Sequence, residues 1–360
     1  LKSASISETE FNVWLYHLLL FRGSVGEAFR LYRSRKETIA FKRTIPNYKQ
    51  FDDLEDLIYK NNSVLLISEG GPGDEIRMST LLDEISSYVG KLYISCDPRL
   101  KSLFERSFPS IDFIQVAKNR DDRRKFDYKD RDKVGDAFAA KIVNNIFIEK
   151  AEKVDKVCSI FDLLGLLRHD RLSFRNNTSR LTPDKGLVGV YKKAMLNHKN
   201  IKIGLAWRSM IRSSARSKHY LSVEDLSAFR GKENIEIWVL QPDWDAGEIN
   251  QLREIFGESN VHLAEDVDLI DDFERQAALI VGLDAVISPC STTAELASAL
   301  GIKTYILSNS YMTSWRKNED GSDIWYANSR LITGENVGNK RTLVLNLIKE
   351  IDYLSGKHSG

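Results

Sequence analysis

Three consecutive hydroxyl residues, Ser291, Thr292 and Thr293, stand between an apolar run and a run of small helix-forming residues within 287–306. This pattern predicts a buried strand, a tight turn, a helix stopped by a glycine and a second strand. A helix N-terminus presents unpaired N–H groups and a partial positive charge, which makes the turn a candidate phosphate site. A hydroxyl residue before a helix is also the ordinary N-cap, and on the turn alone capping is the stronger interpretation.

A glycine-rich turn in the first half of the chain, EGGPGDEIR (69–77), offers carboxylates at a helix start. Gly71 and Gly73 allow the backbone to approach a ligand closely, and both are candidate donor-binding positions. Asp74 and Glu75 fall in the first helical turn and are the candidate catalytic residues, with Asp74 as general base toward a hydroxyl. Helix capping is the alternative role for Asp74 and the favoured one without other evidence. The turn matches neither GxGxxG nor a P-loop.

Cations follow the predicted strand IKIGLAW (201–207), beginning with Arg208 and Arg212. Several arginines at a strand end form a credible anion clamp, although most charge runs are solvated loops. The clamp is favoured because this loop leaves the same sheet edge as the 291–293 turn. Gln241 ends the next strand, and Trp244 follows it with an aromatic face for a base or sugar. The remaining basic residues of the loop are Arg216, Lys218 and His219.

Other kinds of catalytic site find little support in the sequence. His169, His198 and His262 show no metal-ligand spacing such as HxxxH, so we expect no metal. GxSxG is absent, which argues against a hydrolase of that kind. The three cysteines lie far apart without CxxC spacing and therefore indicate a reducing compartment rather than a disulfide framework.

Length and composition indicate a two-domain globular protein. The chain has 360 residues, more than the roughly 250–300 that one hydrophobic core usually accommodates. Its net charge is only +1, which argues against a general nucleic-acid binder. No apolar run approaches the roughly 20 residues that cross a bilayer, and the start lacks a signal-peptide layout. Because the sequence does not begin with Met, we expect it to be cut from a longer protein.

Hydrophobic periodicity places these motifs on an α/β framework. Residues 8–40 predict two helices interrupted at Gly23, and the spacing supports the unit of a helical repeat and a plain helical hairpin equally. Strands then alternate with helices, so each half predicts a doubly wound parallel sheet whose ligands bind beyond the strand ends. The charged run 118–133 predicts a solvated loop, and helices are expected over 136–152 and 159–167. The expected strands are 64–68, 91–95, 111–116, 201–207, 235–241, 260–263, 284–288 and 303–307.

The resulting domain assignment has three parts. Residues 1–55 form a repeat-like helical segment, 56–184 an N-terminal Rossmann-like domain, and 185–360 a C-terminal Rossmann-like domain. The last helix is a candidate to pack back on the N-terminal domain.

Several segments in this order resemble a known family. They are GPGDEI, CDPRLKSLFERSFPSI (96–111), IGLAWR (203–208), LQ (240–241), DDF (271–273) and DAVISPCSTTAELASALGIKTYIL (284–307). They are similar to the glycosyltransferase domains that follow tetratricopeptide repeats in bacterial proteins. Those domains are related to heptosyltransferases and more distantly to O-GlcNAc transferases. GSVGEAFRLYRSRK (23–36) resembles the last repeat before such domains.

The resemblance implies a GT-B fold, with the acceptor held by the N-terminal domain and the nucleotide donor mainly by the C-terminal one. By position, Asp74 matches the proposed base, and Arg208 with its loop matches the donor-phosphate clamp. The 291–293 turn matches the hydroxyl turn at the phosphate. Gln241 matches a strand-end residue near the nucleotide.

Two positions depart from the pattern: relatives commonly have Asp in place of Pro289 and His in place of Glu295, itself a candidate donor-binding residue. The expected activity is a cytoplasmic, metal-independent and cofactor-free transfer of a sugar. The donor is an NDP-sugar or a CMP-ulosonic acid, and the acceptor is a hydroxyl on a protein or glycan. The inner membrane face is the alternative location. A catalytically silent GT-B-like domain that binds glycans or proteins is the alternative function. An NAD-type Rossmann enzyme is disfavoured because neither half has GxGxxG.

Overall fold

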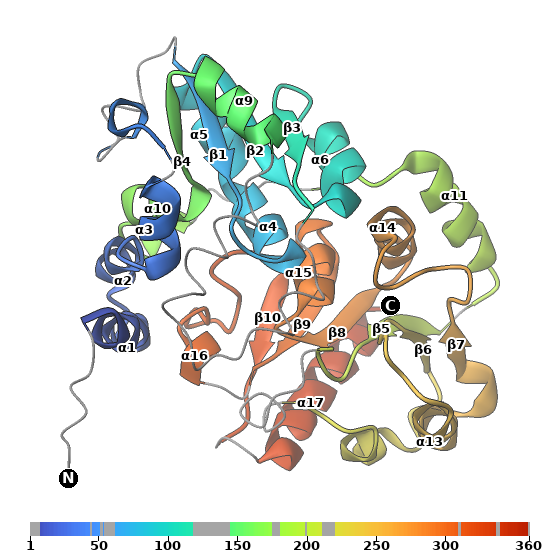
Figure 1. Cartoon of the computed structure of the whole chain (residues 1–360). Coiled ribbons are helices and arrows are strands. Elements are labelled where there is room, and N and C mark those ends of the chain that lie inside the picture. Colours follow the sequence, from blue (N-terminus) through green and yellow to red (C-terminus); the bar gives the residue numbers. More distant parts are fainter. Residues whose placement is uncertain are drawn as a thin grey trace. The chain divides into compact units, whose positions relative to one another are not determined.

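The computed structural model divides into two compact units, 1–179 and 180–360 (Figure 1). Each unit contains a parallel sheet with helices between its strands, so the predicted α/β fold class is confirmed. None of the helices in the described residues is long and apolar enough to cross a membrane. The structure describes residues 8–43, 45–50, 53, 62–117, 145–174, 181–198, 200–210, 220–308, 311–335 and 339–358. The predicted loop 118–133 and part of the predicted helix 136–152 lie outside these ranges.

The first unit begins with helices and continues as a four-stranded sheet of order β3-β2-β1-β4, parallel throughout. Its elements are α1 (Glu8–Phe21), α2 (Val25–Tyr32), α3 (Lys36–Arg43), η1 (Asn47–Lys49), β1 (Ser63–Ile67), α4 (Pro72–Met78), η2 (Ser79–Leu81), α5 (Leu82–Tyr88), β2 (Lys91–Cys96), η3 (Pro98–Leu100), α6 (Lys101–Ser107), β3 (Asp112–Gln115), α9 (Asn145–Lys153), β4 (Lys156–Ser159), α10 (Ile160–Leu167) and η4 (Leu172–Phe174).

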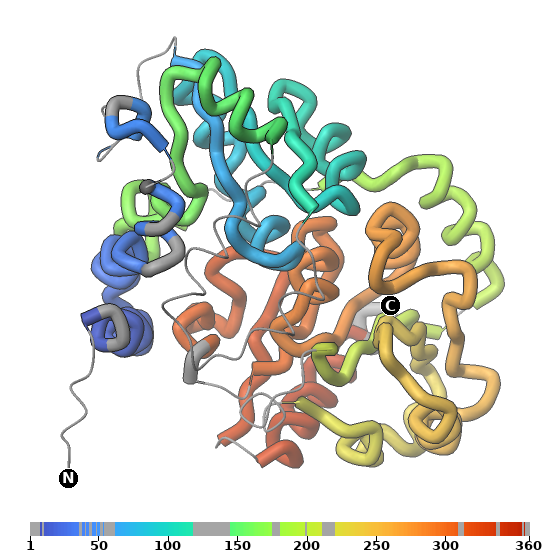
Figure 2. The backbone as a smooth tube through the Cα atoms, in the orientation of Figure 1, coloured from blue at the N-terminus to red at the C-terminus, as the bar shows by residue number. Residues whose placement is uncertain are grey.

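Strand β4 is not predicted by the sequence patterns, because KVCS is too short to show a periodicity. The structure pairs it with β1, Val64 opposite Lys156, and Ser159 then caps α10 by accepting the N–H of Phe161 at 3.1 Å. In Figure 2 the green β4 runs beside the blue β1. The topology therefore reverses between β1 and β4, and residues following these two strands lie at a switch point of the first sheet.

The N-terminal helical hairpin is present, and Gly23 at its turn has a φ of 82°, a conformation that favours glycine. Its second helix, α2, packs on α10. The approach is close, because a Cβ on Gly26 would lie 2.1 Å from the carbonyl oxygen of His169. On α1, Trp14 and Phe21 remain largely exposed. The hairpin thus packs on the first sheet's own helix.

The second unit is a six-stranded parallel sheet of order β10-β9-β8-β5-β6-β7. The strand β10 and the 3₁₀ form of η5 are not predicted by the sequence patterns. The elements are α11 (Lys185–Ala194), β5 (Ile201–Leu205), η5 (Glu224–Phe229), β6 (Ile235–Val239), α13 (Ala246–Phe256), η6 (Glu258–Asn260), β7 (Val261–Leu263), α14 (Phe273–Val281), β8 (Ala285–Pro289), α15 (Thr292–Ala299), β9 (Lys303–Leu307), α16 (Tyr311–Ser314), β10 (Ser329–Ile332) and α17 (Lys340–His358).

The larger hydrophobic cluster of the second unit lies on one face of this sheet. Ile203, Leu205 and Ile237 of the central strands are buried against Leu252 of α13 and Leu347 of α17. The last helix, α17, thus packs on η5 and β10 of its own unit. Because the apolar residues of β5 and β6 lock both strands in place, the residues that follow them are held at a rigid edge.

Candidate functional site

The candidate site lies at the carboxyl edge of the second sheet, where the strand order reverses. β5 and β8 are neighbours, with Leu205 opposite Ile287, and the chain proceeds outward from them in opposite directions. Ligands of open α/β sheets bind at such a switch point. Arg208 follows β5 and the 291–293 turn follows β8, so the structure brings the two predicted phosphate elements to adjacent strand ends.

Ser291 is the N-cap of α15: its hydroxyl accepts the N–H of Ala294 at 3.5 Å and shares a 2.8 Å hydrogen bond with Ser288. The capping interpretation is therefore confirmed for Ser291. Thr292 and Thr293 are the first residues of the helix, where backbone N–H groups have no acceptor within the helix. Thr292 is partly exposed and Thr293 is buried. The predicted glycine stop also exists, since Gly301 has a φ of 80°.

Gln241 fixes the ends of β5 and β6 to each other. Its Oε1 accepts the backbone N–H groups of Trp207 and Arg208, both at 3.0 Å, and its side chain is fully buried. Its Nε2 donates to Oδ1 of Asp243 at 2.5 Å. Gln241 therefore joins the carboxyl ends of β5 and β6 through side-chain hydrogen bonds.

Arg208 points toward the start of α13. Its guanidinium is ion-paired with Glu248 through both carboxylate oxygens and donates to the carbonyl oxygen of Asp243 at 2.6 Å. The side chain is only 10% exposed. Glu248 is thus a residue of the site that the sequence analysis does not predict, because it lies within a helix rather than directly after a strand. Its sequence signal is the capping box Asp245-x-x-Glu248, which the structure forms. Arg212, Arg216, Lys218 and His219 lie outside the described residues.

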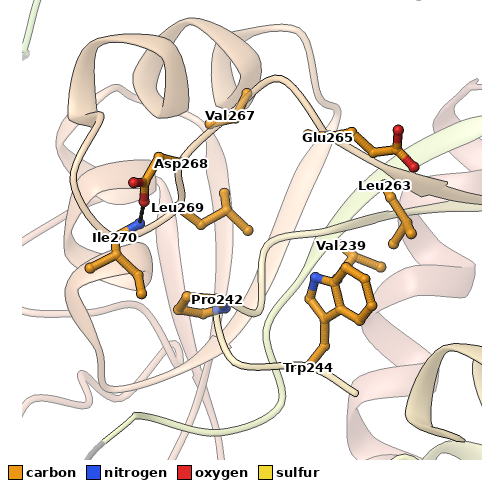
Figure 3. A pocket seen from close by; sticks show the side chains of 10 residues that line it. Val239, Pro242, Trp244, Leu263, Glu265, Val267, Asp268, Leu269 and Ile270 are labelled. Atoms are coloured by element: carbon orange, nitrogen blue, oxygen red, sulfur yellow. Dashed lines mark hydrogen bonds between the residues drawn. The ribbon is translucent and has the colours of Figure 1, made fainter. Parts of the chain in front are cut away.

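A cavity of about 230 Å³ opens at the carboxyl ends of β6 and β7 (Figure 3). Trp244, predicted to offer an aromatic face, lines it together with Pro242 and Leu269. The indole is 40% exposed. Most of the residues that line it are apolar, and Glu265 and Asp268 add carboxylates, a mixture that ligand pockets commonly show.

Glu295, one of the two departures from the family pattern, is buried rather than open. Oε1 accepts from Arg316 at 2.7 Å, and Arg316 also pairs with Asp323; all three side chains are at most 5% exposed. Burial raises the pKa of Asp323, while the Arg316 guanidinium works against this shift. Arg316 lies in a segment that the sequence patterns leave unassigned, and it links α15 to the loop before β10.

In the first unit the glycine-rich turn follows β1 at that sheet's switch point. Gly71 caps α4, with Pro72 and Gly73 inside its first turn. Asp74 accepts the Gly71 N–H at 3.2 Å, pairs with Arg77, and keeps 41% of its side chain exposed. Glu75 is buried and accepts the N–H of Asp97 at 2.8 Å. Of the two candidate catalytic carboxylates, only Asp74 presents its oxygens to solvent.

Comparison with known proteins identifies the fold. No protein-family model matches the chain. Protein FlbA of Caulobacter vibrioides is 26% identical over 328 residues, which are 89% of this chain and 51% of FlbA. The chain thus spans about half the length of the curated relative it matches.

Two solved structures share the architecture. One is a glycosyl transferase family 9 structure from Veillonella parvula, at a TM-score of 0.53 and 14% identity, covering 83% of this chain and 98% of that one. The other is the E. coli ADP-heptose LPS heptosyltransferase II, at a TM-score of 0.50 and 14% identity, covering 84% and 100%. The chain therefore has the GT-B glycosyltransferase fold, with a helical segment preceding it.

Proposed function

We propose that this chain is a glycosyltransferase that moves a sugar from a nucleotide-activated donor to a hydroxyl acceptor on a protein or glycan. The donor is an NDP-sugar or a CMP-ulosonic acid. The observation that carries the proposal is the pairing, at one sheet edge, of the α15 N-terminus with the cavity beside Trp244. A phosphate matches the first and a base or sugar ring matches the second.

Residue roles follow from this placement. The N–H groups of Thr292 and Thr293 stabilise the leaving phosphate as negative charge develops on it. Arg208 and Gln241 shape the edge beside it, and Arg208 contributes positive charge that Glu248 partly offsets. Asp74 takes the acceptor proton, and Glu75 supports the strand end through Asp97. We place the reaction in the cytoplasm, with transfer itself independent of a metal.

The alternative is a catalytically silent domain that binds glycans or proteins. Two ion pairs favour it, Arg208 with Glu248 and Glu295 with Arg316. In each pair a candidate donor-binding residue already has a charged partner within the chain. Calorimetry with CDP, UDP, GDP, ADP and CMP separates the two functions. Clear binding of one of these nucleotides, the winning nucleotide below, supports the enzyme and identifies its donor class. Absence of binding by all five supports the silent domain.

Thr292→Glu tests the phosphate seat itself. A carboxylate at the first position of α15 suits the helix dipole, so folding stability should hold or rise. The same charge repels a phosphate, so affinity for the winning nucleotide should fall at least tenfold. Lys185→Glu, at the first position of α11, is the matched control and should leave nucleotide affinity unchanged. Equal nucleotide affinity of Thr292→Glu and Lys185→Glu would show that the phosphate does not bind at the α15 N-terminus.

A further inference from the structure

The second unit brings together three side chains of types that ligate metals, although they lie far apart in the sequence. They are His198, between α11 and β5, Glu236 on β6 and His262 on β7. Nδ1 of His198 lies 2.6 Å from Oε2 of Glu236, and Nε2 of His262 lies 3.3 Å from the same oxygen. The three ligand atoms all fall within 4.8 Å of one another.

The sheet register explains this meeting. In the β6–β7 ladder Trp238 is opposite His262. Glu236 precedes Trp238 by two residues and therefore projects on the same face of the sheet. The rings of His198 and His262 are 4.8 Å apart, and the Trp238 ring lies 4.8 Å from that of His262. The cluster thus lies on a face of the sheet, and neither Glu236 in β6 nor His262 in β7 is the last residue of its strand.

Two atoms of the cluster lack ordinary hydrogen bonds. Oε2 of Glu236 and Nε2 of His262 are buried, and among the described residues neither has a hydrogen-bond partner of ordinary geometry. The Glu236 side chain is only 7% exposed. Lone pairs that approach this closely without hydrogen bonds repel one another unless a cation or a proton lies between them. A protonated imidazole or a bound cation would relieve this repulsion.

We propose that His198, Glu236 and His262 bind a divalent transition-metal ion of the Zn²⁺ class, with water as a fourth ligand. Two imidazoles and one carboxylate are a known zinc ligand set. Tetrahedral Zn²⁺ with bonds of about 2.1 Å separates ligand atoms by roughly 3.4 Å, close to the 3.3 Å found between His262 and Glu236. Nδ1 of His198 has to move away from Glu236 by roughly 0.8 Å, which its position in a connecting loop allows.

The ion joins the α11–β5 connection to β6 and to the short edge strand β7. None of its three ligands belongs to the Thr292 turn or to the lining of the cavity, so we assign the ion a structural role. Mg²⁺ does not substitute for it, because Mg²⁺ prefers an oxygen ligand shell.

The test is titration of the metal-stripped chain, without a polyhistidine tag, with ZnCl₂ at pH 7.5, followed by calorimetry and thermal unfolding. We expect one Zn²⁺ per chain and a Tm rise of roughly 5–10 °C at a hundredfold excess over Kd. MgCl₂ should produce neither. Substituting Co²⁺ should give the visible absorption of a four-coordinate nitrogen and oxygen site.

His262→Ala should weaken Zn²⁺ binding by about tenfold or more, since even residues that only support a ligand are worth about 10- to 100-fold. Glu236→Gln keeps the side-chain shape and should weaken binding equally if His262→Ala fails to fold. His169→Ala, at an exposed histidine outside the cluster, is the matched control and should bind like wild type. Absence of a stoichiometric site, or equal binding by His262→Ala and His169→Ala, would overturn the proposal.

Discussion

The carboxylate of Glu248 holds the guanidinium of Arg208 through both of its oxygens. The Oε1 atom that meets Arg208 also accepts Nε1–H of Trp207 at 3.1 Å, and Oε2 accepts the backbone N–H of Asp245 at 3.1 Å. One side chain thus ties the end of β5 to the start of α13. Since Arg208 lies at the carboxyl edge of the second sheet, where the candidate site is, the shape of that edge depends on Glu248.

Glu248→Gln should lower the free energy of unfolding by about 1–3 kcal/mol, because Arg208 is largely buried and loses its counter-charge. Urea unfolding monitored by tryptophan fluorescence measures the change. Glu254→Gln, at an exposed position on the same helix, should stay within about 0.5 kcal/mol of wild type. Equal midpoints for the two variants would show that the pairing adds nothing to stability.

Trp244→Ala tests the cavity as a base or sugar site. Stacking of a base on an aromatic side chain contributes about 1–3 kcal/mol, so Kd for the winning nucleotide should rise about 10- to 100-fold. Trp244→Phe keeps an aromatic face and should lose less. Trp14→Ala on α1, where the ring is 76% exposed, controls for the loss of a surface tryptophan. An unchanged Kd in Trp244→Ala would place the nucleotide elsewhere.

The features that the sequence predicts correctly depend on local signals. The turn at Ser291 and the stop at Gly301 each need only a few neighbouring residues. The alternation of strands and helices is also local, since each strand is a short segment rich in apolar residues that stands between two helical patterns. That alternation was enough to predict two parallel sheets and the strand ends where the candidate site lies.

The remaining features depend on residues that only the folded chain brings together. Arg316 reaches back to Glu295, which is 21 residues away, and nothing in the sequence around either residue indicates the pairing. Glu236 meets His198 and His262 from separate elements, so a search for HxxxH spacing overlooks them. The role of Glu248 needs the position of Arg208 as well as its capping box. Long-range ion pairs of this kind require the sheet register, which single-sequence patterns do not provide.

Asp74→Asn tests the proposed base. The backbone contact from Gly71 needs only an acceptor oxygen, which Asn retains, so folding stability should change little. A general base is lost, so kcat should fall about 10²- to 10⁴-fold while donor KM stays constant. Asp184→Asn, the same substitution at the N-cap of α11, should keep full turnover. Full turnover by a folded Asp74→Asn variant would exclude Asp74 as the base.

Asp162 on α10 gives the first unit a specific pH dependence. Its side chain is 2% exposed, its Oδ1 has no hydrogen-bond partner among the described residues, and Lys42 Nζ lies 3.6 Å from its Oδ2. Burial raises the pKa of Asp162 to about 6, against a smaller lowering by Lys42. The folded chain therefore keeps this proton between about pH 4 and pH 6, where the unfolded chain has released it. The contribution of Asp162 to stability must fall as pH rises through this window, by at most about 3 kcal/mol.

Asp162→Asn removes that dependence, because an amide carries no charge at either pH. The variant should match wild type near pH 4 and exceed it in free energy of unfolding by up to about 3 kcal/mol at pH 7.5. Urea unfolding at both pH values measures the difference between the two chains. Asp112→Asn, at a side chain that is 54% exposed, should leave the difference between the two pH values unchanged. Parallel pH profiles for wild type and Asp162→Asn would mean that Asp162 is ionised in the folded chain throughout the window, because Lys42 then outweighs its burial.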